Sequence, residues 1–381
     1  MRKLQLLAIV VAVCFLGGAG LAQSKRRARN ISQANGRYPA KRIPWKGPTI
    51  LKPLNMRLLT TLYGDVSSPD RIAVPDDVIQ NFDLSPDGST LVCAYFPSTL
   101  IVWDTQTGRR KKVIEPWKTG FGDVAFSPDG TMFVTGPGNM TAETAARTIT
   151  FWNAKTYRTT GKIVSAGSVQ SVKFSPDGKS LAVVSDVETG EGSSKTIVEL
   201  WDVQSKKPAA VQPAKGRSID GSALFIMSRV AFSPDGSRLA TSTKQTVEVW
   251  DVKTGELAQT LRGHEVDVTS VSFSPDGRFL VSTGERQDSA ETTPPGELVI
   301  WDARTGEQVK TLPGYTYALF SPDGKLIASR SEDKDYSLID AATGNVISHF
   351  PQTGALRFSR NGKRAASYDD LVVIRTWQVL K

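Results

Sequence analysis

The chain has 381 residues, of which 22% are charged and 39% hydrophobic, a composition typical of a soluble globular protein. Its net charge of +9 comes from the N-terminus, because residues 1–54 hold 11 of the 47 Lys and Arg residues and no Asp or Glu. The remaining residues carry 36 basic against 38 acidic side chains, which excludes a globally basic nucleic-acid-binding body.

Residues 1–22 predict a secretory signal peptide, with a basic "MRK" followed by an apolar run that ends in small residues. Gly20 and Ala22 suit the −3 and −1 positions, so we expect cleavage between Ala22 and Gln23 and a periplasmic or extracellular location. The alternative is an uncleaved membrane anchor, which the basic "SKRRAR" directly after it would favour. Cleavage removes Cys14 and leaves Cys93 alone, so the mature chain forms no intrachain disulfide.

Residues 23–54 are basic, contain Pro and Gly and show no periodic apolar face, which predicts a flexible arm. Such an arm could adhere to an acidic surface such as an anionic polymer or lipid headgroups. The alternative interpretation is a solvated linker.

A tetrapeptide repeats through the rest of the chain. Pro at its second position presets a type I turn, Asp suits the third position, and Gly adopts the left-handed conformation that closes a hairpin. A short strand usually ending in Phe precedes each copy, and a second apolar strand follows it. The sequence "SPDG" stands at 85–88, 127–130, 175–178, 233–236, 274–277 and 321–324, and the eroded copy "SRNG" stands at 359–362.

A second motif follows each hairpin, as in "VEVWDVKTG" (247–255) and "LVIWDARTG" (298–306). It reads as a third strand that ends in Trp-Asp and a turn, after which a fourth strand such as "ELAQTLRGH" (256–264) begins. Four antiparallel strands repeated about every 45 residues are typical of one blade of a β-propeller. Seven copies predict an all-β, seven-bladed propeller over residues 55–381.

The two linked motifs resemble the WD-repeat family, and the resemblance covers residues 55–381. It implies a single propeller domain that acts as a monomeric protein-interaction platform. The chain also departs from the family pattern. It has one Gly-His dipeptide, Gly263-His264, Ile339 replaces one Trp, and Asn153 and Gln378 replace two Asp residues.

In this family a His, a Ser or Thr, an Asp and the Trp can form a hydrogen-bonded network within a blade. The resemblance assigns such a structural network to the fifth unit through His264, Ser282 or Thr283, and Trp301, with the acidic member left open. It assigns Ser331 and Asp333 to the sixth unit, which lacks both the His and the Trp. Few blades can hold the network complete, so we expect packing to stabilise most of them.

The last unit lacks a fourth strand, and an open ring would leave a long unpaired edge. The segment "RLLTTLYGD" (57–65) matches "ELAQTLRGH" (256–264), since both contain Thr-Leu-x-Gly. We therefore expect Leu58–Tyr63 to complete the last blade by pairing with Leu371–Trp377.

Function in propellers tends to lie in the loops of one face. Long connections at 64–79, 136–147, 186–195, 211–227 and 284–297 build such a face here. Aromatic side chains can anchor a protein partner there. The alternative is that each one plugs the top of its own blade. The candidates are Trp117, Phe121, Phe225 and Tyr315.

The sequence favours a non-catalytic role with no cofactor, no metal and no specific nucleic-acid partner. His264 and His349 are its two histidines, and no Cys/His cluster, phosphate loop or nucleophile elbow occurs. The primary hypothesis is therefore an exported platform for unidentified protein partners. The alternatives are small-molecule or glycan binding at the channel mouth, with a lactonase-like or esterase-like activity, and surface adhesion through the basic arm.

Overall fold

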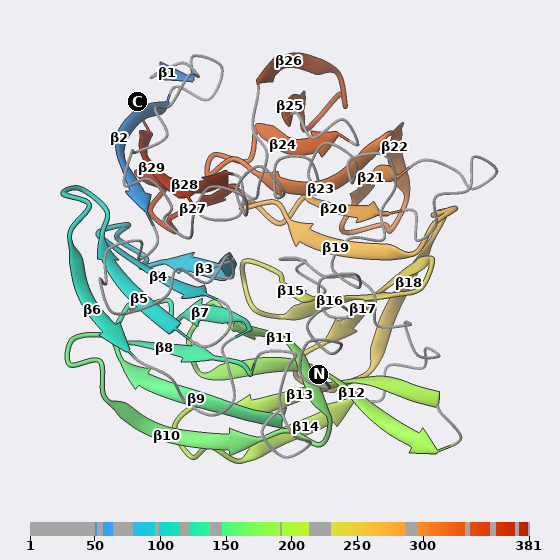
Figure 1. Ribbon diagram of the computed structural model, residues 1–381. Helices are drawn as coiled ribbons and strands as arrows, with labels where there is room; N and C mark the ends of the chain where they lie inside the picture. Colours follow the sequence, from blue (N-terminus) through green and yellow to red (C-terminus); the bar gives the residue numbers. More distant parts are fainter. Residues whose placement is uncertain are drawn as a thin grey trace, which may run out of the picture.

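A computed structural model describes residues 50–51, 56–63, 79–95, 99–114, 122–137, 147–190, 193–212, 230–285, 296–331, 336–350, 356–369 and 373–379. Within these ranges the chain forms 29 β-strands and no α-helix. The strands build seven antiparallel sheets, which are arranged as the blades of a ring (Figure 1). The prediction of a seven-bladed, all-β propeller is confirmed.

Blades 1 to 6 each consist of four consecutive strands. Blade 1 contains β3 (Ile79–Leu84), β4 (Thr90–Tyr95), β5 (Thr99–Asp104) and β6 (Arg110–Ile114); blade 2 contains β7 (Val124–Phe126), β8 (Met132–Thr135), β9 (Thr148–Asn153) and β10 (Thr159–Val164); blade 3 contains β11 (Ser168–Phe174), β12 (Ser180–Gly190), β13 (Ser193–Asp202) and β14 (Pro208–Gln212). Blade 4 contains β15 (Val230–Phe232), β16 (Arg238–Thr243), β17 (Thr246–Asp251) and β18 (Leu257–Arg262); blade 5 contains β19 (Val268–Phe273), β20 (Phe279–Gly284), β21 (Glu297–Asp302) and β22 (Gln308–Pro313); blade 6 contains β23 (Tyr315–Phe320), β24 (Leu326–Ser331), β25 (Tyr336–Asp340) and β26 (Val346–Phe350).

The repeated tetrapeptides form the hairpin turns between the first and second strands. In the six SPDG copies the Ser hydroxyl bonds to the Asp carboxylate two residues later at 2.5–2.6 Å. The Gly residues have φ between 66° and 74° in all seven copies, a conformation that residues with a Cβ rarely adopt. The turn chemistry read from the sequence therefore fixes the seven hairpins.

Blade 7 is built from both ends of the chain. Its strands are β27 (Leu356–Phe358), β28 (Arg364–Asp369), β29 (Val373–Val379) and β2 (Met56–Tyr63), and β2 pairs antiparallel with β29. The predicted closure is confirmed, although β2 begins two residues before Leu58, and residues 371–372 lie outside the described residues. A short fifth strand, β1 (Ile50–Leu51), pairs with β2 at the end of the segment expected to be a flexible arm.

The hydrophobic core lies between neighbouring blades. At the first junction, Val92 and Leu100 of blade 1 share a cluster with Phe133 and Trp152 of blade 2, whose rings stack at a centroid distance of 5.9 Å. At the closing junction, Trp377 of blade 7 shares a cluster with residues of blade 1. Each blade therefore covers the apolar face of the next, and the ring needs every blade to bury its core.

Candidate functional site

The four candidate aromatic anchors are largely outside the described part of the chain. Trp117, Phe121 and Phe225 lie outside it, and so do most residues of the long connections. Tyr315 begins β23, is half-buried and packs against the core cluster of blades 5 and 6. Its hydroxyl lies 3.3 Å from the Ser337 hydroxyl. Tyr315 therefore takes part in packing and in a hydroxyl contact within blade 6.

His264, Ser282 and Trp301 lie together in blade 5. The Nε2 atom of His264 lies 2.6 Å from Ser282 Oγ, and Trp301 Nε1 donates to the same oxygen at 2.8 Å. The acidic member that the sequence left open is Glu297, whose Oε1 lies 2.9 Å from His264 Nδ1. Burial raises the pKa of Glu297, but bonds from His264 and from backbone N–H groups outweigh it and leave that pKa below its ordinary value. All four side chains are buried, so this network stabilises the blade.

The bond from the Trp to a hydroxyl recurs without the histidine. Blades 2, 4 and 7 contain this bond at 2.8–3.0 Å. The Trp Nε1 donates from Trp152 to Thr135 in blade 2, from Trp250 to Thr241 in blade 4, and from Trp377 to Ser367 in blade 7. Ser331, the candidate in blade 6, ends β24 and is half-buried, while Asp333 lies outside the described residues. Ile339 takes the place of the Trp there and is fully buried.

Both histidines of the chain contact a serine, a pair that could form a catalytic dyad. His349 Nδ1 lies 2.9 Å from Ser337 Oγ in blade 6. Ser337 and Ser282 are each only 1% exposed, however, so neither hydroxyl can reach a substrate. Burial raises the pKa of the Cys93 thiol far above its ordinary value, which makes this side chain an inert part of the core.

The first strands of the blades contact one another around the inner wall of the ring. A chain of polar contacts crosses four of them. Arg357 Nη2 donates to Asn81 Oδ1 at 3.3 Å, Asn81 Nδ2 donates to Asp123, and Ser171 Oγ donates to the other Asp123 oxygen at 3.2 Å. These contacts join blade 7 to blades 1, 2 and 3. We call Asn81, Asp83, Asp123, Lys173 and Arg357 the inner polar cluster.

Asp83 and Lys173 of this cluster have shifted pKa values. Burial raises the pKa of Asp83, against the opposing effect of Lys173, Arg357 and backbone N–H donors. Burial also lowers the pKa of Lys173, and the positive charge of Arg357 adds to that effect. The sequence carries a signal for this cluster at the position two residues before the turn serine. That residue is charged in only three copies, as Asp83, Lys173 and Arg357.

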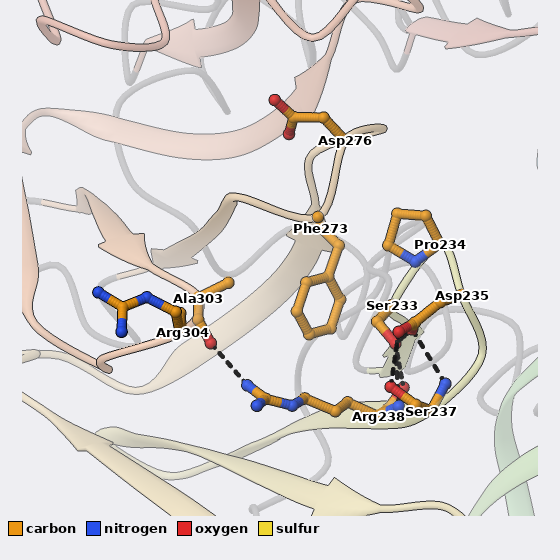
Figure 2. Close-up of a pocket in the computed structure, with 10 residues that line it drawn as sticks. Ser233, Pro234, Asp235, Ser237, Arg238, Phe273, Asp276, Ala303 and Arg304 are labelled. Carbon is orange, nitrogen blue, oxygen red and sulfur yellow. Dashed lines mark hydrogen bonds between the residues drawn. The ribbon is translucent and has the colours of Figure 1, made fainter.

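A shallow cleft of about 310 Å³ lies between the first turns of blades 4 and 5. Figure 2 shows Arg238 crossing it, where its Nη1 donates to the backbone oxygen of Ala303 at 2.8 Å. Asp235 bonds to the Ser233 and Ser237 hydroxyls, and these bonds lower its pKa. The polar groups of this cleft therefore belong to the turns and the blade junction, and they form no convergent binding site.

Two general observations limit the chemistry of the described residues. They contain no group of three or more His, Cys, Asp or Glu side chains that could hold a metal ion. They also contain no helix long and apolar enough to cross a membrane.

Comparison with known proteins supports a WD-repeat β-propeller. The family model "WD domain, G-beta repeat" matches residues 217–251 and 255–289. The chain is 26% identical over 310 residues to a guanine nucleotide-binding protein subunit beta of Zea mays, which covers 75% of this chain and 73% of that protein. It is 28% identical over 211 residues to nuclear distribution protein PAC1 of Arthroderma otae, which covers 49% of this chain and 46% of that protein. It is also 28% identical over 264 residues to protein tipD of Dictyostelium discoideum, which covers 65% of this chain and 37% of that protein. These similarities support a protein-interaction role.

Proposed function

Because the repeats, the closed ring and the relatives support a WD-repeat β-propeller, we propose that this chain is a non-catalytic platform for protein partners and works after export. The observation that carries the proposal is that the histidine and cysteine side chains of the described blades make contacts within those blades. His264 and His349 each contact a buried serine, and Cys93 is buried. The plant relatives are named as subunits of a larger protein, which is consistent with assembly as the task of this ring.

The experiment is affinity capture of the tagged full-length protein from the organism's own exported fraction. We expect a stoichiometric protein partner, captured equally well when residues 23–54 are removed. Loss of the partner on that removal would favour adhesion through the basic arm instead. Steady turnover of lactone or ester substrates by the purified chain would contradict a non-catalytic role.

Export is the second element of the proposal and rests on residues 1–22. N-terminal sequencing of the exported protein tests it, with Gln23 as the expected first residue. A mature chain that still begins at residue 1 in a membrane fraction would favour the anchor alternative.

The inner polar cluster favours one second candidate, the binding of a small polar molecule in the central channel. Asp83, Lys173 and Arg357 are half-buried on the innermost strands, so each retains contact with solvent at the inner wall. Lys173→Met and Asp83→Asn would weaken such binding and leave protein capture unchanged. Screening of small polar molecules and sugars by thermal shift would detect the ligand.

A further inference from the structure

One position in the turn between the third and fourth strands is basic in blades 1 to 3 and acidic or neutral in blades 4 to 6. In blades 1 to 6, the residue six positions after the Trp, or six after Ile339 in blade 6, accepts a backbone hydrogen bond of 2.8–2.9 Å from the residue directly after that Trp or Ile. This bond makes the six positions structurally equivalent, and all six side chains are exposed. The residues are Arg109, Arg158 and Lys207 in blades 1 to 3, and Glu256, Glu307 and Asn345 in blades 4 to 6.

The same difference in charge extends along the outer edges of blades 1 to 3 and blades 4 to 6. In blades 1 to 3 the turn and fourth strand, residues 104–114, 153–164 and 202–212, contain nine Lys or Arg and two Asp. The equivalent segments of blades 4 to 6, residues 251–262, 302–313 and 340–350, contain four Lys or Arg and five Asp or Glu. Positive charge is therefore concentrated on one half of a ring whose overall charge is close to neutral.

Side-chain contacts link the turns of these blades across their junctions. The Nζ atom of Lys206, in the turn of blade 3, lies 5.2 Å from the Phe151 ring of blade 2. Tyr157, in the turn of blade 2, packs against the core cluster of blades 1 and 2. Figure 1 shows β6 and β10 as the outer strands of two successive blades along the rim. We call six exposed basic residues of this rim the basic edge: Arg109, Lys112, Lys155, Arg158, Lys162 and Lys207.

Protection of the outer strands against aggregation does not explain the basic edge. Lysines on an edge strand do prevent unwanted pairing with other chains. The fourth strands of blades 4 to 6 are the same kind of edge, yet they expose Leu257, Val309 and Ile347 with few charges beside them. The charge is thus a property of one half of the ring and not a requirement of the fold.

We propose that the basic edge binds an acidic polypeptide segment of a protein partner. This inference rests on the proposed function and names the chemistry of the partner. Guanidinium and ammonium groups pair with carboxylates, and Arg can do so in a bidentate way. The basic N-terminal arm of this chain has the same sign as the edge, so the arm is not the occupant.

Two other polyanions fit the surface less well. Single-stranded nucleic acid is bound through aromatic stacking platforms, and the aromatic side chain at the edge, Tyr157, is half-buried in packing. A flat bilayer would meet a convex rim at one or two blades, whereas the edge extends over three. An extended peptide can follow that curvature and contact all three blades.

The test uses the full mature chain and a fluorescent 20-residue poly-glutamate peptide, with binding measured by fluorescence anisotropy. The edge variant combines Arg109→Glu, Arg158→Glu and Lys207→Glu. The matched control combines Lys253→Glu, Arg262→Glu and Arg304→Glu, which makes the same change in net charge on exposed positions of blades 4 and 5. We expect the edge variant to weaken binding at least tenfold and the control less than twofold.

A neutral series with Gln at the same three edge positions covers the case in which charge reversal disturbs folding, and we expect it to weaken binding at least threefold. Equal loss in the edge variant and the control would overturn the proposal. So would tighter binding of a 20-residue oligo-dT or of phosphatidylserine vesicles than of the peptide. Failure of the peptide to bind would overturn the inference that the partner segment is acidic. It would leave the proposed platform function standing, because affinity capture of a partner tests that function separately.

Discussion

Leu62 of β2 lies opposite Ile374 of β29, so the two ends of the propeller domain meet in one buried strand pair. Both side chains are at most 1% exposed and belong to the core cluster that blade 7 shares with blade 1. A second contact crosses the same junction, where Thr376 Oγ1 donates to the backbone oxygen of Thr105 at 2.7 Å. The closing strand therefore supports the junction between the last and first blades as well as its own sheet.

Leu62→Ala should destabilise the domain strongly, since burial makes this side chain part of the closing junction. Deletion of a buried Leu side chain typically costs about 2–5 kcal/mol. The control is Leu257→Ala in the fourth strand of blade 4, where the leucine is 44% exposed and we expect about 0.5 kcal/mol or less. Urea unfolding of both variants measures the difference, and equal effects would show that closure adds little.

Most of the fold could be predicted from the sequence because its determinants are local. Ser85, Asp87 and Gly88 specify a hairpin through their own turn geometry, and similar turns recur at a spacing typical of blades. The closing strand could be found because its pattern matches the fourth strand of blade 4. The charged position two before the turn serine marks three members of the inner polar cluster, but no local pattern shows that Arg357 and Asn81 are neighbours. Glu297 was missed because a long connection separates it from the hairpin before it.

The hydroxyl of Ser282 contacts two partners, so its removal should cost more than removal of an equivalent hydroxyl with one. Ser282→Ala leaves both Trp301 Nε1 and His264 Nε2 without their buried partner. A buried polar group left unpaired costs about 1–3 kcal/mol. We expect Ser282→Ala to destabilise by about 2–4 kcal/mol and Ser367→Ala, which removes the bond from Trp377 Nε1, by about 1–2 kcal/mol. Chemical denaturation measures both values, and a smaller effect at Ser282 would contradict the network.

The ionisation of Glu297 should make part of the free energy of unfolding depend on pH. Its pKa in the fold is below the ordinary value of 4.5, so folding favours the carboxylate form. The stabilisation is complete above the unfolded pKa and is lost as the pH falls through the folded pKa. The stability difference between the wild type and Glu297→Gln should therefore be constant near pH 7 and shrink below about pH 4.5. Chemical denaturation of both proteins near pH 7 and below about pH 4.5 tests this. A stability difference between them that grows in acid would refute it.

Asn81 acts as both donor and acceptor in the inner polar cluster. Asn81→Asp keeps an acceptor for Arg357 but replaces the amide donor to Asp123 with a second carboxylate. Two adjacent carboxylates repel each other unless they share a proton, so this variant should be less destabilised near pH 4.5 than at pH 7. Asn81→Ala should lack that recovery. Thermal unfolding relative to the wild type at each pH distinguishes the two variants, and identical profiles would contradict the proposed contact.

We propose that the ring holds a protein partner and performs no chemistry itself. Calorimetric titration of the purified mature chain with the partner recovered by capture tests it most directly. We expect saturable binding with a stoichiometry near one and no turnover of ester or lactone substrates under the same conditions. Absence of binding heat together with steady substrate turnover would contradict it.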